Sequence, residues 1–507
     1  MTYSPGIASA FNKTKNRTNH LSPQSGMCSL CSQDCVGTCE IGLAATLGAR
    51  TVYPTTTGTN QVGSEKDYPI DYSYFNINGR VFGAIGANET YEEATIFNVK
   101  LERTFGKEYP VKTTMPILLP ALIKLNWADY FAGAAMAGVC CVIGEDARTK
   151  DPNLVMENGK VKDFPAVEKM QAAFKKYYRG YGQIALQCNV EDDMIGVPEV
   201  AIQKHGVEAI EFKFGQSAKG TQPANRLNNI EEAYAKKAQG YMVHPDPDDP
   251  TVIKAYEKGI CPNFYKYSRL PLWDEIYLKK RIDELKKIGL KNVYFKMACY
   301  DDRDVERVLR MASDIGVDMV TFDGAGGGSG YSPNKMMNEW GQPTIVLEKT
   351  VCNIVNSLKY ENAWIPGITI TGGIVSEDQV FKALAYGNND ITAIGICRGA
   401  MAAAMTGKKV GEMIAEGNVP AHLKEYGSTV EEIYGDLADL RAYYGKEANN
   451  FPTGAIGVFS YLNKIAFGVR HFAALNRKFD IEYLDRSDLL PLTREAKLLL
   501  EGKWLEY

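Results

Sequence analysis

Short runs of apolar residues alternate with longer amphipathic stretches between about residue 112 and residue 415. Within stretches such as 304–316 and 377–387, the apolar positions recur at helical spacing. This alternation is typical of parallel strands joined by helical crossovers. Eight apolar runs are candidate strands: MPILLP (115–120), VCCVIG (139–144), QIALQC (183–188), AIEFKF (209–214), NVYFKM (292–297), MVTFDG (319–324), ITITGG (368–373) and AIGICR (393–398).

Eight regular strand and helix units predict an α/β fold, the (β/α)8 TIM barrel, which closes at eight strands and needs about 250 residues. The span 112–415 is long enough for it. A doubly wound open sheet is the alternative, and the lack of a break in mid-chain favours closure. The interval 216–290 is longer than one helix, so we expect a lid or insertion there, at the catalytic face.

The segments on either side of the barrel have a different texture. Residues 1–111 begin with a polar stretch, and later mix Thr/Gly turns with short aromatic strands, as in 72–86. We interpret 1–111 as an N-terminal cap. Residues 416–507 are rich in tyrosine and helix-forming residues. We expect this helical C-terminal extension to pack on the barrel or on a neighbouring subunit.

Composition narrows the choice of partners. The 507 residues carry a formal net charge of −4, and the pI is near 5.9. Nucleic acid and anionic membranes are bound by strongly basic faces, and this composition does not indicate one. We therefore expect neither as a partner. The first residues form no apolar signal region, and no run of about 18 apolar residues occurs. We therefore expect a soluble cytoplasmic protein, a homo-oligomer, acting on a small molecule.

Four cysteines lie close together near the start of the chain, at Cys28, Cys31, Cys35 and Cys39. Four thiolates at this spacing suit an iron-sulfur cluster or structural zinc, whereas disulfide frameworks are mainly found in small secreted domains. We favour one [4Fe–4S] cluster, with zinc and free or redox-paired thiols as alternatives. The five histidines are scattered, so a histidine-based metal centre is not expected.

The last two predicted strands end in residues suited to a phosphate. In TIM barrels a phosphate usually lies in the loops after strands seven and eight. Strand seven ends in Gly372 and Gly373, and strand eight ends in Arg398 and Gly399 at the start of a helix. Backbone N–H groups, a helix N-terminus and a guanidinium can together bind a phosphate. The alternative is an ordinary tight turn, which also uses glycine.

The sixth predicted strand runs into a glycine-rich stretch, 323–330, in which Asp323, Gly324, Gly326 and Gly327 are candidate cofactor contacts. The stretch does not fit G-x-G-x-x-G, and a helix does not follow at once, which disfavours a dinucleotide site. Its backbone can come very close to a ligand. We interpret it as a wall for a flavin or substrate, with a surface loop as the alternative.

Polar residues stand near the ends of other predicted strands. Lys213 and Lys296 lie within apolar runs, and a buried ammonium is costly unless a partner meets it. Each should face an anionic or electron-rich ligand, such as the pyrimidine edge of a flavin, unless it reaches solvent or pairs with a core carboxylate. Glu145 and Gln187 are further candidates, with ordinary loop or structural roles as alternatives.

The remaining cysteines near strand ends are Cys188, Cys299 and Cys397. Buried thiols usually behave as small hydrophobic groups, so we expect no redox or nucleophilic role for them. The pair 140–141 lies within an apolar run, and we expect it to belong to the core.

These motifs resemble the FMN-binding synthase domain of glutamate synthase, particularly the short archaeal-type proteins. The resemblance covers roughly 112–415. Its motifs are MPI (115–117), GED (144–146), EFKFGQSAKG (211–220), FKM (295–297), FDGAGGGSGYSP (322–333) and ITITGGIVSEDQVFKALAYG (368–387). The last one is also similar to the phosphate-binding run of FMN-dependent hydroxyacid oxidases. Those enzymes carry a catalytic histidine before their glycine-rich run, where this chain has Phe322 and Asp323.

The resemblance implies a barrel that binds FMN, with Lys296 near the flavin and Gly372, Gly373, Arg398 and Gly399 around its phosphate. It implies a substrate face with Glu145, Lys213, Gln216 and Lys219. The implied reaction is reductive amination of 2-oxoglutarate to glutamate, with electrons that reach the flavin through the iron-sulfur cluster. Because no NAD(P)H site is visible, we expect ferredoxin or an electron-transfer subunit as donor.

The chain departs from that family in several places. The family's cluster cysteines follow strand eight, where this chain has only Cys397. No glutaminase domain or glycine-repeat β-helix is found, so free ammonia or a separate amidotransferase subunit would supply nitrogen. The family's Pro-Pro-Pro-His-His-Asp-Ile-Tyr stretch corresponds to 269–277, which lacks both histidines. Two alternatives stay open: an FMN-dependent dehydrogenase that oxidises an amino or hydroxy acid and exports electrons through the cluster, and a non-catalytic electron-transfer subunit.

Overall fold

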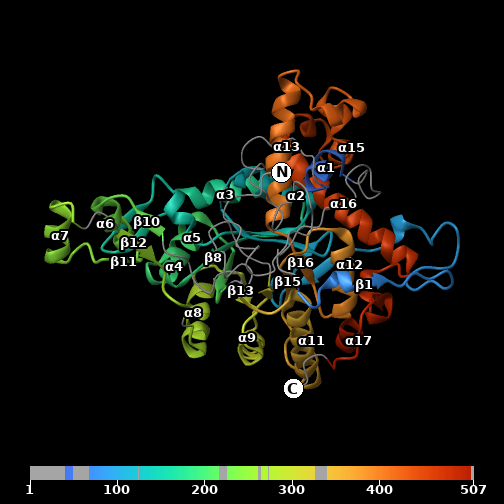
Figure 1. Cartoon of the computed structure of the whole chain (residues 1–507), viewed down its shortest axis with the longest axis horizontal. Coiled ribbons are helices and arrows are strands. Elements are labelled where there is room, and N and C mark those ends of the chain that lie inside the picture. Colours follow the sequence, from blue (N-terminus) through green and yellow to red (C-terminus); the bar gives the residue numbers. More distant parts are fainter. Residues whose placement is uncertain are drawn as a thin grey trace.

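The computed structural model describes residues 40–48, 68–123, 125–215, 225–260, 264–271, 273–325 and 340–503. At its centre is a closed barrel of eight parallel strands (Figure 1). Each strand overlaps one of the eight predicted runs, so the predicted barrel is confirmed. In their order around the barrel the strands are β13 (Asn292–Ala298), β14 (Met319–Asp323), β15 (Gly367–Thr371), β16 (Ala393–Gly395), β4 (Ile117–Leu122), β5 (Cys140–Ile143), β8 (Ile184–Cys188) and β9 (Ala209–Lys213).

Helices outside the barrel cover its strands. They are α2 (Trp127–Ala137), α3 (Pro165–Lys175), α4 (Val190–Met194), α5 (Val197–His205), α8 (Glu275–Lys287), α9 (Asp302–Ile315), α11 (Thr344–Tyr360), α12 (Glu377–Gly387) and α13 (Arg398–Ala415). In α9 the buried positions Val305, Val308 and Ala312 follow helical spacing, so one face packs on the barrel. Asp301 caps its first turn by accepting the N–H of Arg303, and Gly316 ends it in the left-handed conformation.

The amino-terminal end of the barrel is closed by a hairpin of β2 (Arg103–Phe105) and β3 (Val111–Thr113). Phe105 packs against Tyr294 inside the barrel, with 5.9 Å between the ring centroids. The same small core includes Leu118, Val142 and Met319, and these inward-facing side chains fill the lower barrel. Any ligand site must therefore lie at the opposite end, where the strands have their carboxyl ends.

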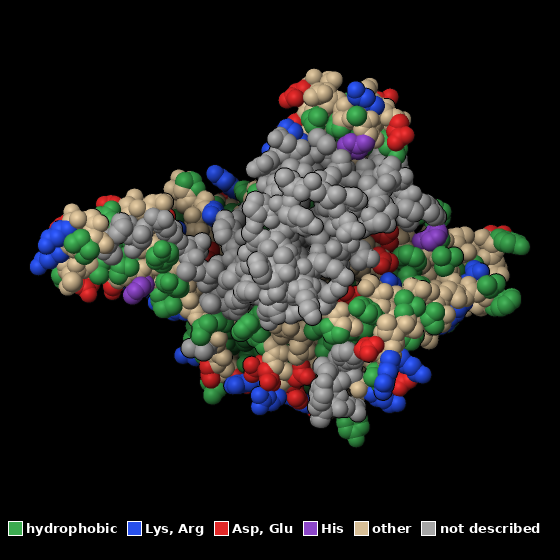
Figure 2. Space-filling model, in the orientation of Figure 1, with side chains coloured by type: hydrophobic (Ala, Val, Ile, Leu, Met, Phe, Trp, Pro, Cys, Tyr) green, Lys and Arg blue, Asp and Glu red, His purple; other side chains and the backbone are tan. Residues whose placement is uncertain are grey.

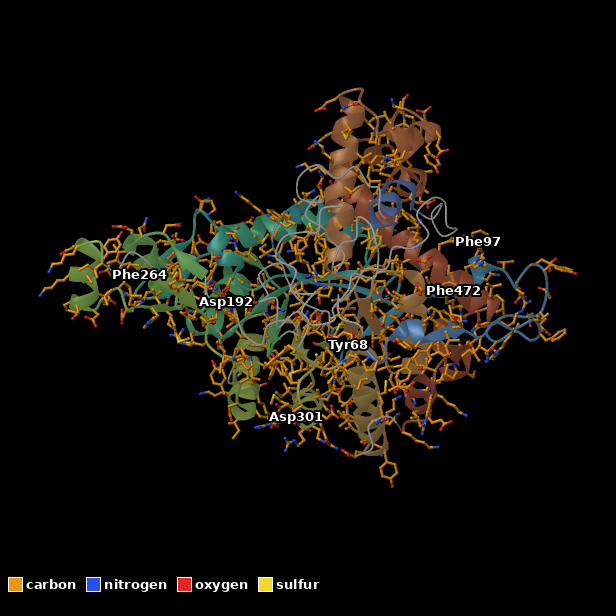
Figure 3. The ribbon with its side chains drawn as sticks, viewed as in Figure 1. Tyr68, Phe97, Asp192, Phe264, Asp301 and Phe472 are labelled. Carbon is orange, nitrogen blue, oxygen red and sulfur yellow. The ribbon has the colours of Figure 1, made fainter. Side chains whose placement is uncertain are left out.

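Part of the long interval between β9 and β13, residues 225–260 and 264–267, forms an arm. Its antiparallel sheet has the order β10 (Asn225–Leu227), β12 (Phe264–Tyr267), β11 (Met242–His244), and packs with α6 (Ile230–Ala238) and α7 (Pro250–Glu257). Phe264 lies in a separate small core with Leu227, Ile230 and Ala233. The arm extends sideways from the barrel (Figures 1 and 3). The predicted insertion is present: its residues 225–260 and 264–267 form this lateral arm, and α8 then returns the chain to the barrel. A second short hairpin, β6 (Val155–Glu157) and β7 (Lys160–Asp163), follows β5.

The segments before and after the barrel are joined to each other. Strand β1 (Phe75–Ile77) pairs with β17 (Leu489–Pro491), so 68–111 and the end of the chain share a two-stranded sheet. Of the aromatic strand expected over 72–86, the structure forms only the short β1 and an isolated bridge from Ile85 to Lys478; the turns between them leave Phe82 exposed. The domain boundaries at 111 and 415 stay predictions.

The C-terminal extension is helical, as predicted, and packs on the barrel's outer helices. Its longest element, α16 (Thr453–Leu475), lies beside α13, α2 and α12 (Figure 1). Phe472 of α16 contacts Phe381 of α12, with 5.7 Å between ring centroids. The other helices outside the barrel and arm are α1 (Glu40–Leu47), α14 (Val430–Ile433), α15 (Leu437–Tyr444) and α17 (Arg494–Leu500).

On the face shown in Figure 2, basic and acidic side chains of the described residues are interspersed. Within the described ranges, every helix is either too short or too polar to cross a membrane.

Candidate active site

The carboxyl end of the barrel carries a ring of inward-facing polar side chains. Side chains alternate along a strand, so Lys296 points to the same side as Tyr294, whose ring lies in the barrel core. By the same alternation Glu211 and Lys213 share the inward face with Ala209. Asp323 follows Met319 in the same way on β14. The strands thus bring the predicted site residues Lys213, Lys296 and Asp323 to one mouth, together with Glu211.

The two predicted lysines are neighbours across adjacent strands. Lys213 of β9 and Lys296 of β13 are paired in register, and their residues are only 8% and 6% exposed. Lys213 Nζ donates to Glu145 Oε1, which follows β5. Among the described residues, no hydrogen bond or ion pair within 4 Å reaches the Lys296 ammonium. Lys213 is therefore paired with a carboxylate, whereas Lys296 makes no such close pair with a described residue.

Glu211, which the sequence reasoning missed, lies near both lysines. It is 1% exposed, and Gln187 Nε2 donates to its Oε1 at 2.5 Å. Burial raises the pKa of Glu211, while the nearby Lys296 ammonium and the Gln187 hydrogen bond oppose that rise. The spacing Glu211-x-Lys213 in a buried strand was the available signal, because positions two apart face the same way. Gln187 binds this carboxylate, and its contact with a cofactor stays a prediction.

A buried charge network extends from Glu145 toward the arm. Asn189 Nδ2 donates to Glu145 Oε2 at 3.3 Å and to Asp146 Oδ1 at 3.1 Å. Arg148, whose side chain is fully buried, pairs with Asp146 at 3.2 Å and also with Asp192. Figure 3 shows Asp192 between the barrel and the arm. Every member of this network is met by an opposite charge or an amide, as burial of charges requires.

The network also fixes the base of the arm. Arg148 Nη2 donates to the carbonyl of Gln239 at 3.0 Å, and Lys266 of β12 lies 3.7 Å above the ring of Tyr241. Burial would raise the pKa of Asp146, but Arg148 and Lys266 lower it overall. Asp146 is therefore ionised in the neutral pH range. The position of Glu145 thus depends on contacts that reach into the insertion.

The opposite side of the mouth consists of glycine and backbone. Gly372 and Gly373 follow β15 with φ of +126° and +75°, which side chains rarely adopt. A Cβ at Gly372 would lie 2.6 Å from the carbonyl oxygen of Gly324. The N–H of Gly324 donates to the carbonyl of Thr371 at 2.7 Å. The glycines therefore permit a turn and a close approach of two loops that any side chain would disturb.

Two helices begin at this side, and their N-termini differ. At α12, Gln379 Oε1 accepts the N–H groups of Val375 and Ser376, and Glu377 and Asp378 occupy the first turn. At α13, the preceding residue Cys397 supplies no side-chain cap, and the described first turn contains no acidic residue. The positive end of a helix dipole attracts anions. The start of α13 is thus the more suitable of the two for a phosphate.

Arg398 and Gly399 form that first turn of α13. Burial lowers the pKa of Arg398 to about 10, while Cys397 and Asp323 oppose the shift. The guanidinium still carries its charge at neutral pH. A Cβ at Gly399 would lie 2.7 Å from the hydroxyl oxygen of Tyr461, a residue of α16. The turn is therefore enclosed on one side by the C-terminal extension.

Several predicted residues lie outside the described ranges. These are the candidate substrate residues Gln216 and Lys219, the glycines Gly326 and Gly327, and the four cysteines Cys28, Cys31, Cys35 and Cys39. Within the described ranges, no group of three or more His, Cys, Asp or Glu side chains could bind a metal ion. The iron-sulfur cluster therefore stays a prediction.

The described cysteines near the mouth are buried or half-buried. Burial raises the pKa of both Cys188 and Cys397, which keeps them in the less reactive thiol form at neutral pH. Cys299 is 1% exposed. Cys140 and Cys141 belong to the core, as predicted, and burial raises the pKa of Cys140 to about 12.

Sequence comparison recovers the expected likeness in part of the chain. Residues 269–408 match the family model described as the conserved region in glutamate synthase. This chain contains a glutamate synthase-like region. The matched segment includes β13 to β16, with Lys296, the glycine turns and the start of α13. No curated protein matches the chain significantly.

Solved structures with a similar chain trace include several flavoproteins. A flavocytochrome b2 variant with sulfite bound is 13% identical, with 86% of this chain and 78% of that chain covered and a TM-score of 0.45. A mandelate oxidase variant with a monooxide FMN adduct is 12% identical, with 83% and 88% covered and a TM-score of 0.41. A lactate oxidase from Pediococcus acidilactici is 12% identical, with 83% and 84% covered and a TM-score of 0.44.

Proposed function

We propose that the chain is an FMN-dependent oxidoreductase of the glutamate synthase type. The observation that carries the proposal is Lys296, a buried residue whose side chain points into the barrel mouth and makes no hydrogen bond or ion pair within 4 Å to the described residues. Such a cation is costly unless an electron-rich ligand meets it. It lies on the first strand of the segment that matches the conserved region in glutamate synthase.

The residues of the mouth fit FMN. Lys296 would face the flavin ring, where a positive charge stabilises the reduced form. The start of α13, Arg398 and the turn at Gly372 and Gly373 would bind the phosphate. Asp323 and Gly324 would line the wall between them. When bound, FMN supplies two-electron transfer to or from a substrate.

The substrate proposed is 2-oxoglutarate, converted with ammonia to glutamate and water by two electrons and two protons. Glu145 and Lys213 would lie at the substrate side of the mouth, with Gln216 and Lys219. Because Lys213 is paired with Glu145, a dianionic substrate must either displace that carboxylate or bind against the pair. Electrons are proposed to come from ferredoxin or a partner subunit through a [4Fe–4S] cluster on the four N-terminal cysteines.

Anaerobic isolation tests the cofactor part of the proposal. We expect about four irons and one FMN per chain, and a Cys31→Ser variant that loses iron but keeps flavin. Zinc in place of iron, or unchanged iron in the variant, would overturn the cluster. A flavin-free protein that takes up no FMN would overturn the flavin site.

Substrate addition tests the reaction. The reduced protein should be reoxidised by 2-oxoglutarate with ammonia and not by 2-oxoglutarate alone. Bleaching of the oxidised flavin by amino or hydroxy acids, without that reoxidation, would indicate an enzyme that runs in the oxidative direction. A flavin that responds to neither set of compounds would indicate a non-catalytic electron-transfer subunit.

A further inference from the structure

The C-terminal helix α16 contacts both loops of the proposed phosphate site. The hydroxyl of Tyr461 donates to the carbonyl oxygen of Val375 at 2.6 Å, in the loop between β15 and α12. The same hydroxyl lies against Gly399, where an added Cβ would be 2.7 Å away. Tyr461 is 2% exposed. One buried side chain from outside the barrel thus contacts the loops after strands seven and eight.

A second contact lies one turn further along α16. Lys464, also 2% exposed, donates to Glu377, the first residue of α12. Gly468 packs on the same glutamate, because a Cβ there would lie 2.3 Å from Glu377 Cγ. Residues three and four apart share one face of a helix. Tyr461, Lys464 and Gly468 therefore form one face of α16, directed at the start of α12.

Close helix packing holds this face in place. A Cβ at Gly407 of α13 would lie 2.7 Å from the carbonyl oxygen of Thr453, and one at Gly457 of α16 would lie 2.7 Å from that of Ala403. The two helices approach each other through their glycines, where larger residues would separate them. A shift of α16 would consequently move the start of α13 or lose this packing.

We propose that Tyr461 is a positioning residue of the FMN phosphate site. This inference rests on the proposed function, and it deepens that function by assigning a role to a helix outside the segment 269–408. The hydroxyl donates to the Val375 carbonyl and packs against Gly399, so one side chain lies against both loops. The two loops are thereby positioned relative to each other before the phosphate arrives. Such preorganisation improves affinity because less freedom is lost on binding.

A Tyr461→Phe variant tests this assignment with two ligands. The flavin-free protein is titrated with FMN and with riboflavin, which has the same ring system but no phosphate. We expect Tyr461→Phe to weaken FMN binding roughly five- to tenfold, the effect of losing one ordinary hydrogen bond. Riboflavin binding should be unchanged, so the ratio of the two dissociation constants falls by the same factor.

Tyr434→Phe is the matched control. Tyr434 is a fully buried tyrosine of the same extension whose hydroxyl also donates to a backbone carbonyl, here that of Gly407 in α13, away from the start of that helix. Both variants lose a buried hydrogen bond and should have similarly lowered melting temperatures. Only Tyr461→Phe should change the FMN-to-riboflavin ratio.

The outcomes separate this inference from the proposed function. If wild type binds neither FMN nor riboflavin, the proposed function itself fails. If wild type binds FMN and both variants keep the wild-type ratio, Tyr461 has only a structural role and the inference is overturned. Equal loss of both ligands in Tyr461→Phe would also overturn it, because a phosphate-positioning group has no reason to affect riboflavin.

Discussion

The two halves of the barrel mouth differ in how they are built. Strands β5, β8 and β9 bring together Glu145, Gln187, Glu211 and Lys213, whose side chains bind one another. Strands β14 to β16 end in glycine turns, backbone groups and the start of α13. Lys296, on β13, stands at the border between them. The family match begins at 269, so it includes the glycine half and excludes the charged half.

This difference in construction suggests that cofactor binding and substrate binding depend on separate halves of the mouth. In the glycine half, position is set by backbone conformation and by close packing, so few residue types are tolerated. In the charged half each group balances another, so one substitution changes the charge or position of its neighbours. We infer that the glycine half serves the cofactor and the charged half selects the substrate.

The largest effect on turnover is expected at Lys296, between the two halves of the mouth. Lys296→Met should lower turnover roughly 100- to 1000-fold, the size of effect seen when one preorganised electrostatic group is removed from an active site. Stopped-flow reduction and reoxidation of the flavin would measure it. The variant should retain bound FMN, because the phosphate contacts lie in the other half. Lys213→Met is the control, and an equal loss in both variants would show that the two lysines are equivalent.

A smaller change is expected from the phosphate side. Arg398→Gln should weaken FMN binding roughly 10- to 100-fold, because hydrogen bonds to a charged group are stronger than neutral ones. Fluorescence titration with FMN measures the loss, and riboflavin provides the reference. An unchanged FMN affinity would show that Arg398 does not bind the phosphate. It would contradict the claim that the glycine half of the mouth binds the cofactor.

The charged half should control substrate binding. Glu145→Gln removes the carboxylate that competes with an anionic substrate for Lys213. We expect KM for 2-oxoglutarate to fall roughly three- to tenfold while flavin content is unchanged, since a fewfold change corresponds to about 1 kcal/mol. Steady-state kinetics with varied 2-oxoglutarate checks this. A variant that loses flavin but keeps its KM would reverse the roles of the two halves.

The smallest effect concerns pH and stability. Burial raises the pKa of Glu211 above its ordinary value, so the folded state retains a proton that the unfolded state loses. Stability from this group is present below the ordinary glutamate pKa of about 4.3 and is lost as pH rises through the folded pKa. A Glu211→Gln variant has no carboxylate to ionise, so it should not lose this stability. At pH values above the folded pKa of Glu211 it should melt about 1–3 °C higher than wild type. Thermal melts from pH 4 to pH 8 measure it, and a variant with the same pH dependence as wild type would contradict it.

Much of the fold could be predicted from the sequence, because each barrel strand is a short apolar run followed by a helix. Lys213 and Lys296 were found because a lysine within such a run is unusual. Glu211 lies in the middle of its apolar run and not at the end, so only its alternation with Lys213 indicated that it faces the mouth. The contacts of Tyr461 could not be predicted, since they join segments far apart in the chain. The pairing of Lys213 with Glu145 likewise depends on barrel closure.

Titration of the flavin-free protein with FMN, followed by the change in flavin absorbance, tests the central claim most directly. The account predicts saturable binding at about one FMN per chain, with a spectrum that Lys296→Met perturbs and Lys213→Met perturbs less. The absence of a saturable absorbance change with wild type would contradict a flavin site at this mouth. So would a bound-flavin spectrum that is the same in Lys296→Met as in wild type.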